Sequence, residues 1–209
     1  MTRIVQLDVS GEAGPWERLG FTASSPDLLR IGDVALAFTG ETQERGILAW
    51  TLTGEVPQDI DGLTTRRVTE AAAQTPRGPE HPNGTTHLDH VVVMTPDLDR
   101  TLTALSATGM DLRRVRDAGT PEHPLRQGFY RLGEVILEVV GNVPQDDGSA
   151  RFWGLVAVVP DVDALATDLG PQLVGAPKEA VQPGRRIVTV RREAGLPVPL
   201  AFLTPHVRS

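Results

Sequence analysis

The chain contains no cysteine in its 209 residues, which excludes disulfide frameworks, cysteine-ligated zinc and iron–sulfur sites, and thiol catalysis. Long apolar runs are also missing, because none approaches the roughly 20 residues that cross a bilayer. The first residues lack the apolar stretch of a secretory signal. We therefore expect a cytoplasmic protein without a membrane partner.

Basic side chains are in deficit, since 20 of them stand against 27 acidic ones and give a formal net charge of −7. An acidic balance argues against nucleic acid as a partner. Sequence motifs for nucleotide phosphates, zinc proteases and serine hydrolases are absent as well. Apolar residues nevertheless make up 40% of the chain, which is enough to build a packed core.

The chain repeats itself. Val91–Asp99 and Leu155–Asp163 each consist of an apolar run followed by Pro-Asp-x-Asp, and the second lies 64 residues after the first. An apolar run rich in β-branched residues predicts a buried strand, and the acidic residue after proline can cap a helix that follows. We expect these helices over 98–107 and 162–169, each closed by a glycine just beyond it.

A second repeat extends the unit. Leu28–Gly40 matches Phe129–Gly141, and both segments predict a β-hairpin around a turn of glycine and an acidic residue. Together the repeats define a unit of one strand, one helix and three strands. The stretch over 71–86, which is rich in proline, glycine and threonine, predicts a linker. We expect a degenerate N-terminal module over 1–70, the linker over 71–86, and a domain of paired modules over 87–209, with its copies over 87–141 and about 152–205.

The segments that carry a family resemblance are Leu88–Val93, Pro96–Asp99, Gly133–Val140, Leu155–Pro160 and Pro199–Pro205. The tandem unit they form resembles the vicinal oxygen chelate superfamily, which includes glyoxalase I, bleomycin-resistance proteins, extradiol dioxygenases and methylmalonyl-CoA epimerase. The resemblance implies an α+β fold in which paired βαβββ modules form a cup-shaped mixed sheet, with a partial N-terminal copy. It also implies a small-molecule ligand in the cup, and either a monomer or a homodimer.

Metal-dependent members of that superfamily place ligands on the first and last strands of each module. Carried over to this sequence, the positions of the first complete module are His90 and Glu138. Histidine and glutamate suit divalent Fe, Mn, Ni, Co or Zn, and the same two residues are the candidate catalytic acid and base. In the second module the equivalent of His90 is Gly154, and the last-strand position falls near Phe202–Thr204. The resemblance thus implies half of a metal site.

Further residues are candidates for contacts with a ligand. Arg126 and Tyr130 share one face of a predicted strand, and the guanidinium fork of arginine suits a carboxylate or phosphate. Trp153 could form a wall for a planar molecule, and Gly154 beside it leaves space. Arg185 and Arg186 are further polar candidates. For the arginines, a solvated strand edge with acidic partners is the alternative.

Two functions remain open. One is a metal-assisted lyase, isomerase or dioxygenase that acts on a small oxygen-rich molecule, with the ion as Lewis acid. The alternative is a metal-free protein that binds or sequesters a drug or metabolite, of the bleomycin-resistance type. The pairing of His90 with Glu138 favours the first, whereas the lack of ligands at Gly154 and Thr204 favours the second. A purely structural role for the repeats would make that pairing a coincidence.

Overall fold

The computed structural model of the chain describes residues 2–73, 78–120, 122–141 and 147–206. Within these residues, two mixed β-sheets contain all the named strands. The N-terminal sheet has seven strands in the order β2-β3-β4-β1-β5-β7-β6, and the C-terminal sheet has eight in the order β13-β14-β15-β12-β8-β11-β10-β9. No helix of this described part is both long and apolar enough to cross a membrane.

The N-terminal sheet contains one full unit and one shortened unit. The full unit keeps the order strand, helix, three strands, and its first strand pairs in parallel with its last. In the shortened unit, residues 54–58 form a loop where the other units have a helix. The elements are β1 (Ile4–Val9), α1 (Gly14–Glu17), β2 (Ala23–Ser25), β3 (Leu28–Ile31) and β4 (Val34–Phe38), followed by β5 (Ile47–Thr53), β6 (Asp59–Ile60) and β7 (Leu63–Val68).

The C-terminal sheet contains two full units and confirms the predicted pattern. Both helices have the predicted bounds, and each begins after an aspartate, Asp97 or Asp161, that accepts hydrogen bonds from the first turn. The first unit comprises β8 (His87–Thr95), α2 (Leu98–Ala107), β9 (Leu112–Gly119), β10 (Pro124–Leu132) and β11 (Val135–Gly141). The second comprises β12 (Arg151–Val158), α3 (Val162–Leu169), β13 (Lys178–Glu179), β14 (Arg186–Thr189), a short 3-10 helix (Arg192–Ala194) and β15 (Leu200–Leu203).

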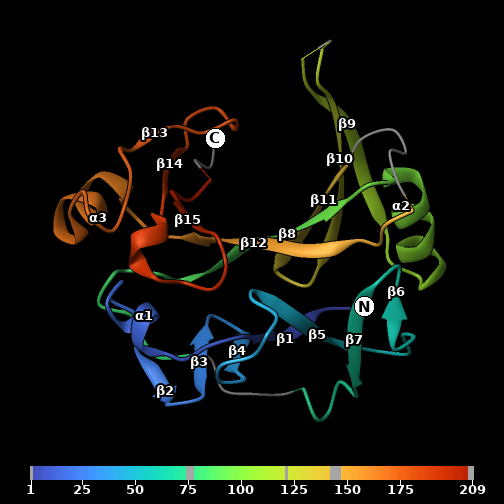
Figure 1. The fold of residues 1–209 in the computed structure, drawn as a ribbon, viewed down its shortest axis with the longest axis horizontal. Coiled ribbons are helices and arrows are strands. Elements are labelled where there is room, and N and C mark those ends of the chain that lie inside the picture. Colours follow the sequence, from blue (N-terminus) through green and yellow to red (C-terminus); the bar gives the residue numbers. More distant parts are fainter. Residues whose placement is uncertain (1, 74–77, 121, 142–146, 207–209) are drawn as a thin grey trace.

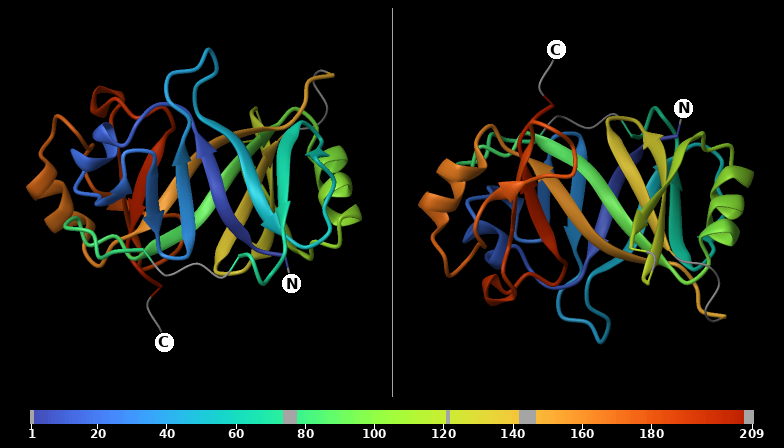
Figure 2. Two further views of the ribbon diagram at one scale, coloured as in Figure 1. Left: turned by 90° about the horizontal axis from the view of Figure 1, so that it is seen from below. Right: turned by 90° about the horizontal axis from the view of Figure 1, so that it is seen from above.

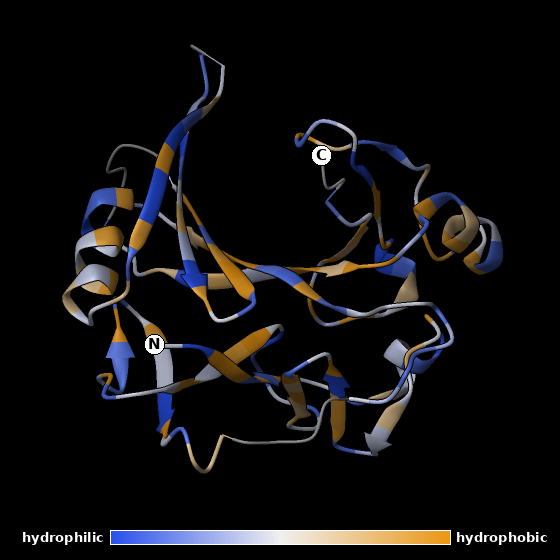
Figure 3. Cartoon of the chain, turned by 180° about the vertical axis from the view of Figure 1, so that it is seen from behind, coloured by the Kyte–Doolittle hydropathy of each residue, from blue (hydrophilic) through white to orange (hydrophobic). Residues whose placement is uncertain are grey.

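The two sheets lie back to back as two layers (Figures 1 and 2). In the C-terminal sheet, β8, β11 and β12 form a floor, while β9 and β10 rise at one side and β14 and β15 at the other. This sheet is therefore U-shaped, as Figure 3 also shows from behind. Helix α2 flanks the side formed by β9 and β10, and α3 flanks the other. The U opens away from the N-terminal sheet.

The face of the floor that packs on the N-terminal sheet is fixed by an aromatic contact. Phe152 of β12 lies edge-on to Trp50 of β5, with ring centroids 5.3 Å apart. Its cross-strand partner Val93 on β8 shares that face. Because successive residues of a strand face opposite sides, Val92 and its partner Glu138 on β11 face the inside of the U. We call this side the concave face.

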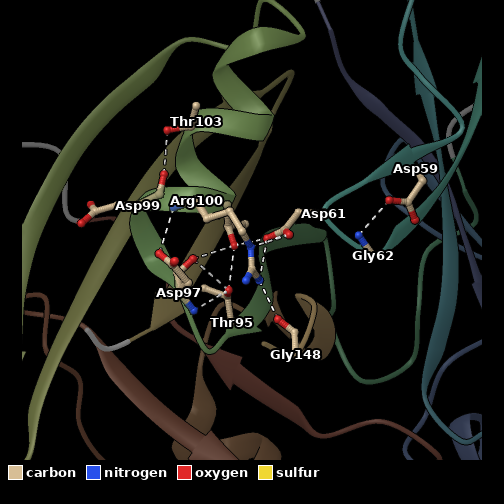
Figure 4. A network of polar contacts seen from close by, with 10 residues as sticks. Asp59, Asp61, Gly62, Thr95, Asp97, Asp99, Arg100, Thr103 and Gly148 are labelled. Carbon is tan, nitrogen blue, oxygen red and sulfur yellow. Dashed lines mark hydrogen bonds and ion pairs between the residues drawn. The ribbon is translucent and has the colours of Figure 1, made fainter. Parts of the chain in front are cut away.

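A polar network joins the two halves at the start of α2 (Figure 4). Asp61, in the turn between β6 and β7, accepts a hydrogen bond from Arg100 Nε at 2.8 Å and one from Thr101 Oγ1 at 2.5 Å. Arg100 Nη2 also donates to the carbonyl oxygen of Gly148 at 2.6 Å. The backbone of Asp61 has a φ of 54°, which aspartate tolerates better than most residues. The network fixes α2, and with it the wall of the U, against the N-terminal sheet.

Candidate functional site

A β-bulge on β8 turns Asp89 and His90 toward the same side of the sheet. His90 pairs with Val156 on β12, but the next pair along the ladder is Leu88 with Ala157, so β8 has one extra residue here. In a regular strand, Asp89 and His90 would face opposite sides. The bulge removes that alternation, and Asp89 Oδ2 lies 2.8 Å from His90 Nδ1.

The floor of the concave face brings His90 together with Glu138. His90 Nε2 lies 3.4 Å from Glu138 Oε2, and both side chains are mostly buried, at 13% and 14% exposure. Strand β11 runs parallel to β8 and places Ile136 beside His90, with Glu138 two residues further along. The two residues that the family resemblance singled out are therefore neighbours on the concave face.

Arg185 holds Asp89 from behind. Its Nη2 donates to Asp89 Oδ1 at 2.6 Å, its Nε donates to the carbonyl oxygen of Thr204 at 2.6 Å, and its Nη1 lies 3.1 Å from His206 Nε2. The Arg185 side chain is 1% exposed. Burial raises the pKa of Asp89, but its hydrogen bonds with His90 and Arg185 outweigh burial and lower that pKa to about 2. Asp89 is thus ionised at neutral pH and acts as an acceptor for the imidazole.

Glu138 is held from the other side by Gln127 and Arg116. Gln127 Nε2 donates to Glu138 Oε1, and Gln127 Oε1 accepts from Arg116 Nε at 2.5 Å. Sequence reasoning missed both residues. The predicted hairpin carried a signal for Gln127, because Glu138 pairs with Phe129 on β10 and a period of two leads to Gln127. A polar chain therefore runs from β9 through the His90–Glu138 pair to Arg185.

Arg126 and Tyr130 share a face of β10 as predicted, but it is the face that α2 covers. Arg126 Nη1 lies 2.9 Å from an oxygen of Asp99 in α2. Tyr130 is 1% exposed, and its hydroxyl donates to the carbonyl oxygen of Leu102 at 3.0 Å. Burial raises the pKa of Tyr130. Neither residue reaches the concave face, so we do not retain them as ligand contacts.

Trp153 and Gly154 lie at a second bulge, on β12, opposite Val92 and Val93. Trp153 is 50% exposed and remains a candidate wall for a ligand. The space predicted at Gly154 is already filled. A Cβ atom built there would lie 3.1 Å from the carbonyl oxygen of Pro199, tighter than ordinary van der Waals contact. The glycine therefore admits the backbone that precedes β15 and leaves no room for a ligand.

The second module supplies no metal ligand. Ala201 pairs with Val156 as Glu138 pairs with Val92, so Ala201 takes the last-strand position that we expected near Phe202–Thr204. Phe202 itself is fully buried in the core. The last-strand position thus carries a methyl group, and the first-strand position, Gly154, carries no side chain at all.

The donor set does not fit a resident divalent metal. His90 Nε2 and Glu138 Oε2 are two donors, whereas protein metal sites usually combine three or more side-chain ligands. Asp89 cannot be the third, because it contacts the opposite ring nitrogen of His90. In the described part of the chain, no group of three or more histidine and carboxylate side chains is placed to hold an ion.

Comparison with solved structures identifies the fold of this chain, whereas comparison by sequence finds no match. No protein-family model matches the chain, and no curated protein matches it by sequence. Among solved structures, a variant of 4-hydroxymandelate synthase from Streptomyces coelicolor aligns with a TM-score of 0.65 at 15% identity, covering 99% of this chain and 94% of that one. A xylose isomerase-like TIM barrel/4-hydroxyphenylpyruvate dioxygenase fusion protein aligns with a TM-score of 0.64 at 13% identity, covering 99% and 50%. Methylmalonyl-CoA epimerase from Mycobacterium tuberculosis aligns with 59% of this chain and 91% of its own, at 17% identity and a TM-score of 0.48.

The first two alignments extend over nearly the whole chain and include both sheets. Together with the repeated unit of strand, helix and three strands, they show that the chain has the vicinal oxygen chelate fold. It is the α+β version with tandem βαβββ modules that the sequence predicted. At these identities the likeness concerns the fold, and one fold hosts several chemistries, so the function must be argued from the residues of this chain.

Proposed function

We propose that this chain binds a small oxygen-rich organic molecule on the concave face of the C-terminal sheet, and that it does so without a metal. The observation that supports this function is the His90–Glu138 pair, whose Nε2 and Oε2 atoms lie 3.4 Å apart on the floor. An oxygen of the ligand placed above the pair would reach both atoms. Trp153, which is half exposed at the bulge of β12 and lies two strands from Glu138, is the candidate for an apolar wall.

The surroundings of the His90–Glu138 pair suit a direct hydrogen bond to a ligand better than the binding of a metal ion. Each of the two side chains is oriented by a neighbour, His90 by Asp89 and Glu138 by Gln127. The positive charge next to Asp89 is already supplied by the buried guanidinium of Arg185. A site with a few oriented polar groups beside apolar side chains is the usual construction for binding a small molecule. This function is the metal-free alternative that the sequence left open.

The test is thermal stabilisation in the presence of a chelator. A panel of hydroxy acids, keto acids, phenols and sugars is screened in EDTA, and a true ligand raises the melting temperature as its concentration exceeds Kd. Glu138→Gln and His90→Gln should abolish the shift. Glu134→Gln should keep it, because Glu134 is exposed in the β10–β11 turn of the same module. Elemental analysis of protein purified without chelator completes the test: a near-stoichiometric metal that is lost in His90→Ala and Glu138→Ala would overturn the proposal.

A second candidate function is catalysis of proton transfer on the bound molecule, as in an isomerase or lyase. It is favoured by the position of His90 between the carboxyl groups of Asp89 and Glu138, since such an arrangement can hold and release a proton. A ligand found by the screen would then take up deuterium from D2O in the presence of the protein. Incorporation should disappear in His90→Gln and persist in Glu134→Gln. A ligand that binds and never exchanges would leave binding alone as the function.

A further inference from the structure

We propose that Arg114 and Arg116 of β9 form an anion subsite on the wall of the concave face, so that the ligand carries a carboxylate or phosphate group. This inference rests on the proposed function, because it names the chemical class of the molecule that would reach the His90–Glu138 pair. It assigns a role to two arginines that sequence reasoning did not single out.

The strand register places both arginines on the concave face. Glu138 on β11 pairs with Phe129 on β10, and Phe129 pairs with Arg114 on β9. Arg116 likewise pairs with Gln127. Residues that are directly opposite in neighbouring strands share a face, so the arginines lie on the same side as Glu138. Neighbouring strands are about 4.8 Å apart, which puts β9 roughly 10 Å from β11 along the sheet. One small molecule can span that distance.

The ring of Phe129 holds the two guanidinium groups in place. The Cζ atoms of Arg114 and Arg116 lie 5.0 Å and 5.4 Å from the ring centroid, within the range of a cation–π contact. Arg116 is fixed further by Gln127, which also holds Glu138. The subsite is thereby linked to the floor pair through a single side chain. Two oriented forks present the planar geometry that carboxylates and phosphates accept.

The charge of this wall is left without a counter-ion in the described residues. Neither Arg114 nor Arg116 forms an ion pair there with a carboxylate, although the chain has more acidic than basic residues. Arg126, on the α2-covered face of the neighbouring strand β10, does have such a partner, with its Nη1 2.9 Å from an oxygen of Asp99. Two like charges over one ring repel each other. A bound anion removes that repulsion and supplies the missing acceptors.

The experiment measures binding of simple anions by calorimetry in EDTA. The probes are benzoate, phenyl phosphate and inorganic phosphate, with benzamide as the neutral counterpart of benzoate. We expect the anions to bind the wild-type chain, and benzamide to bind at least ten times more weakly than benzoate. Arg114→Gln and Arg116→Gln should each weaken the anions about tenfold, the scale of one lost hydrogen bond to a charged group. Arg114→Lys tests whether the fork matters beyond its charge.

Arg126→Gln is the matched control, because it removes the same charge from the neighbouring strand β10 on the opposite face, which α2 covers. It should change the affinity less than twofold. An equal loss in Arg126→Gln would mean a general charge effect and would overturn the inference. The inference would also be overturned if neither Arg114→Gln nor Arg116→Gln changed the affinity for the anions. The same holds if the folded wild-type protein bound none of the anions at 10 mM. Benzoate and phenyl phosphate, compared with each other, decide whether the group is a carboxylate or a phosphate.

The outcome also separates this inference from the proposed function. A neutral ligand that depends on Glu138 but not on the arginines would leave the proposed function standing and overturn the anion subsite. The opposite outcome is that anion binding requires the arginines while no ligand loses affinity in His90→Gln or Glu138→Gln. That outcome would support the subsite and overturn the proposed function.

Discussion

Arg185 Nη2 donates to Asp89 Oδ1 at 2.6 Å and so joins two buried residues that are 96 positions apart in the chain. We predict that Arg185→Met lowers the free energy of unfolding by about 3–5 kcal/mol, because it leaves the ionised Asp89 buried without its guanidinium partner and with His90 alone as a neighbour. Urea titration at pH 7 measures the loss.

Arg186→Met is the matched control for that prediction. Arg186 is 37% exposed and pairs with Asp163 and Glu179, which are more exposed still. Ion pairs at the surface contribute little, so we expect a loss of about 1 kcal/mol or less. Equal losses for the two neighbouring arginines would contradict the special role of the buried pair.

We predict that His81 makes the stability of the fold depend on pH. Its Nδ1 accepts the backbone N–H of Thr22 at 3.1 Å, so Nε2 carries the proton and donates to the carbonyl oxygen of Arg30 at 2.9 Å. Burial lowers the pKa of His81 below its ordinary value of 6.5, against a smaller opposing effect of the Arg30 carbonyl. A base with a lowered pKa binds fewer protons in the folded chain than in the unfolded chain. We therefore expect the free energy of unfolding to be greatest above pH 6.5 and to decrease as the pH is lowered below 6.5.

Urea titrations between pH 8 and pH 5 test this dependence. His81→Gln should flatten it, since glutamine can offer an acceptor and a donor without titrating. His123→Gln is the control for the removal of a histidine, because His123 is exposed. A wild-type stability that is constant over this range would contradict the role given to His81.

The close approach of Pro199 explains why position 154 is a glycine, and this explanation can be tested separately. Gly154→Ala would place a Cβ atom 3.1 Å from the carbonyl oxygen of Pro199 and push β15 away from β12. We expect a loss of about 1–3 kcal/mol in the free energy of unfolding, the usual cost of overpacking. Gly175→Ala is the control, because the nearest atom to its Cβ, the carbonyl oxygen of Thr189, is 3.6 Å away. A neutral Gly154→Ala would show that Pro199 can move and that the position holds spare room.

The elements that were predicted correctly have local causes. The helices over 98–107 and 162–169 follow from an apolar period with an acidic cap before it, and the hairpin of Phe129–Gly141 from its glycine turn. The side on which Arg126 and Tyr130 lie could not be predicted. The period of two puts both on one face, but the docking of α2 decides which face is covered.

The candidate site was predictable only in part, for a similar reason. His90 and Glu138 follow from a family resemblance. The bulge that adds Asp89 to them depends on the register between β8 and β12, which no local pattern encodes. The burial of Arg185 depends on contacts with residues far away in the sequence. Features of this kind become visible only in the folded chain.

Loss of Asp61 should weaken the connection between the two halves. Its carboxylate binds Arg100 and Thr101 at the start of α2, and its side chain is 10% exposed (Figure 4). Asp61→Asn keeps a residue that tolerates the positive φ but removes the charge facing Arg100. We expect a loss of about 2–3 kcal/mol, in line with hydrogen bonds between charged groups. Asp59→Asn, in β6 just before that turn but exposed and bound to the Gly62 N–H, should lose less than about 1 kcal/mol. Proteolysis of the native chain gives a second readout. If Asp61 holds the halves together, Asp61→Asn should be cut faster than the wild-type chain near residues 69–73 and 78–86, and Asp59→Asn should not. Equal cutting of the two variants would place the connection elsewhere.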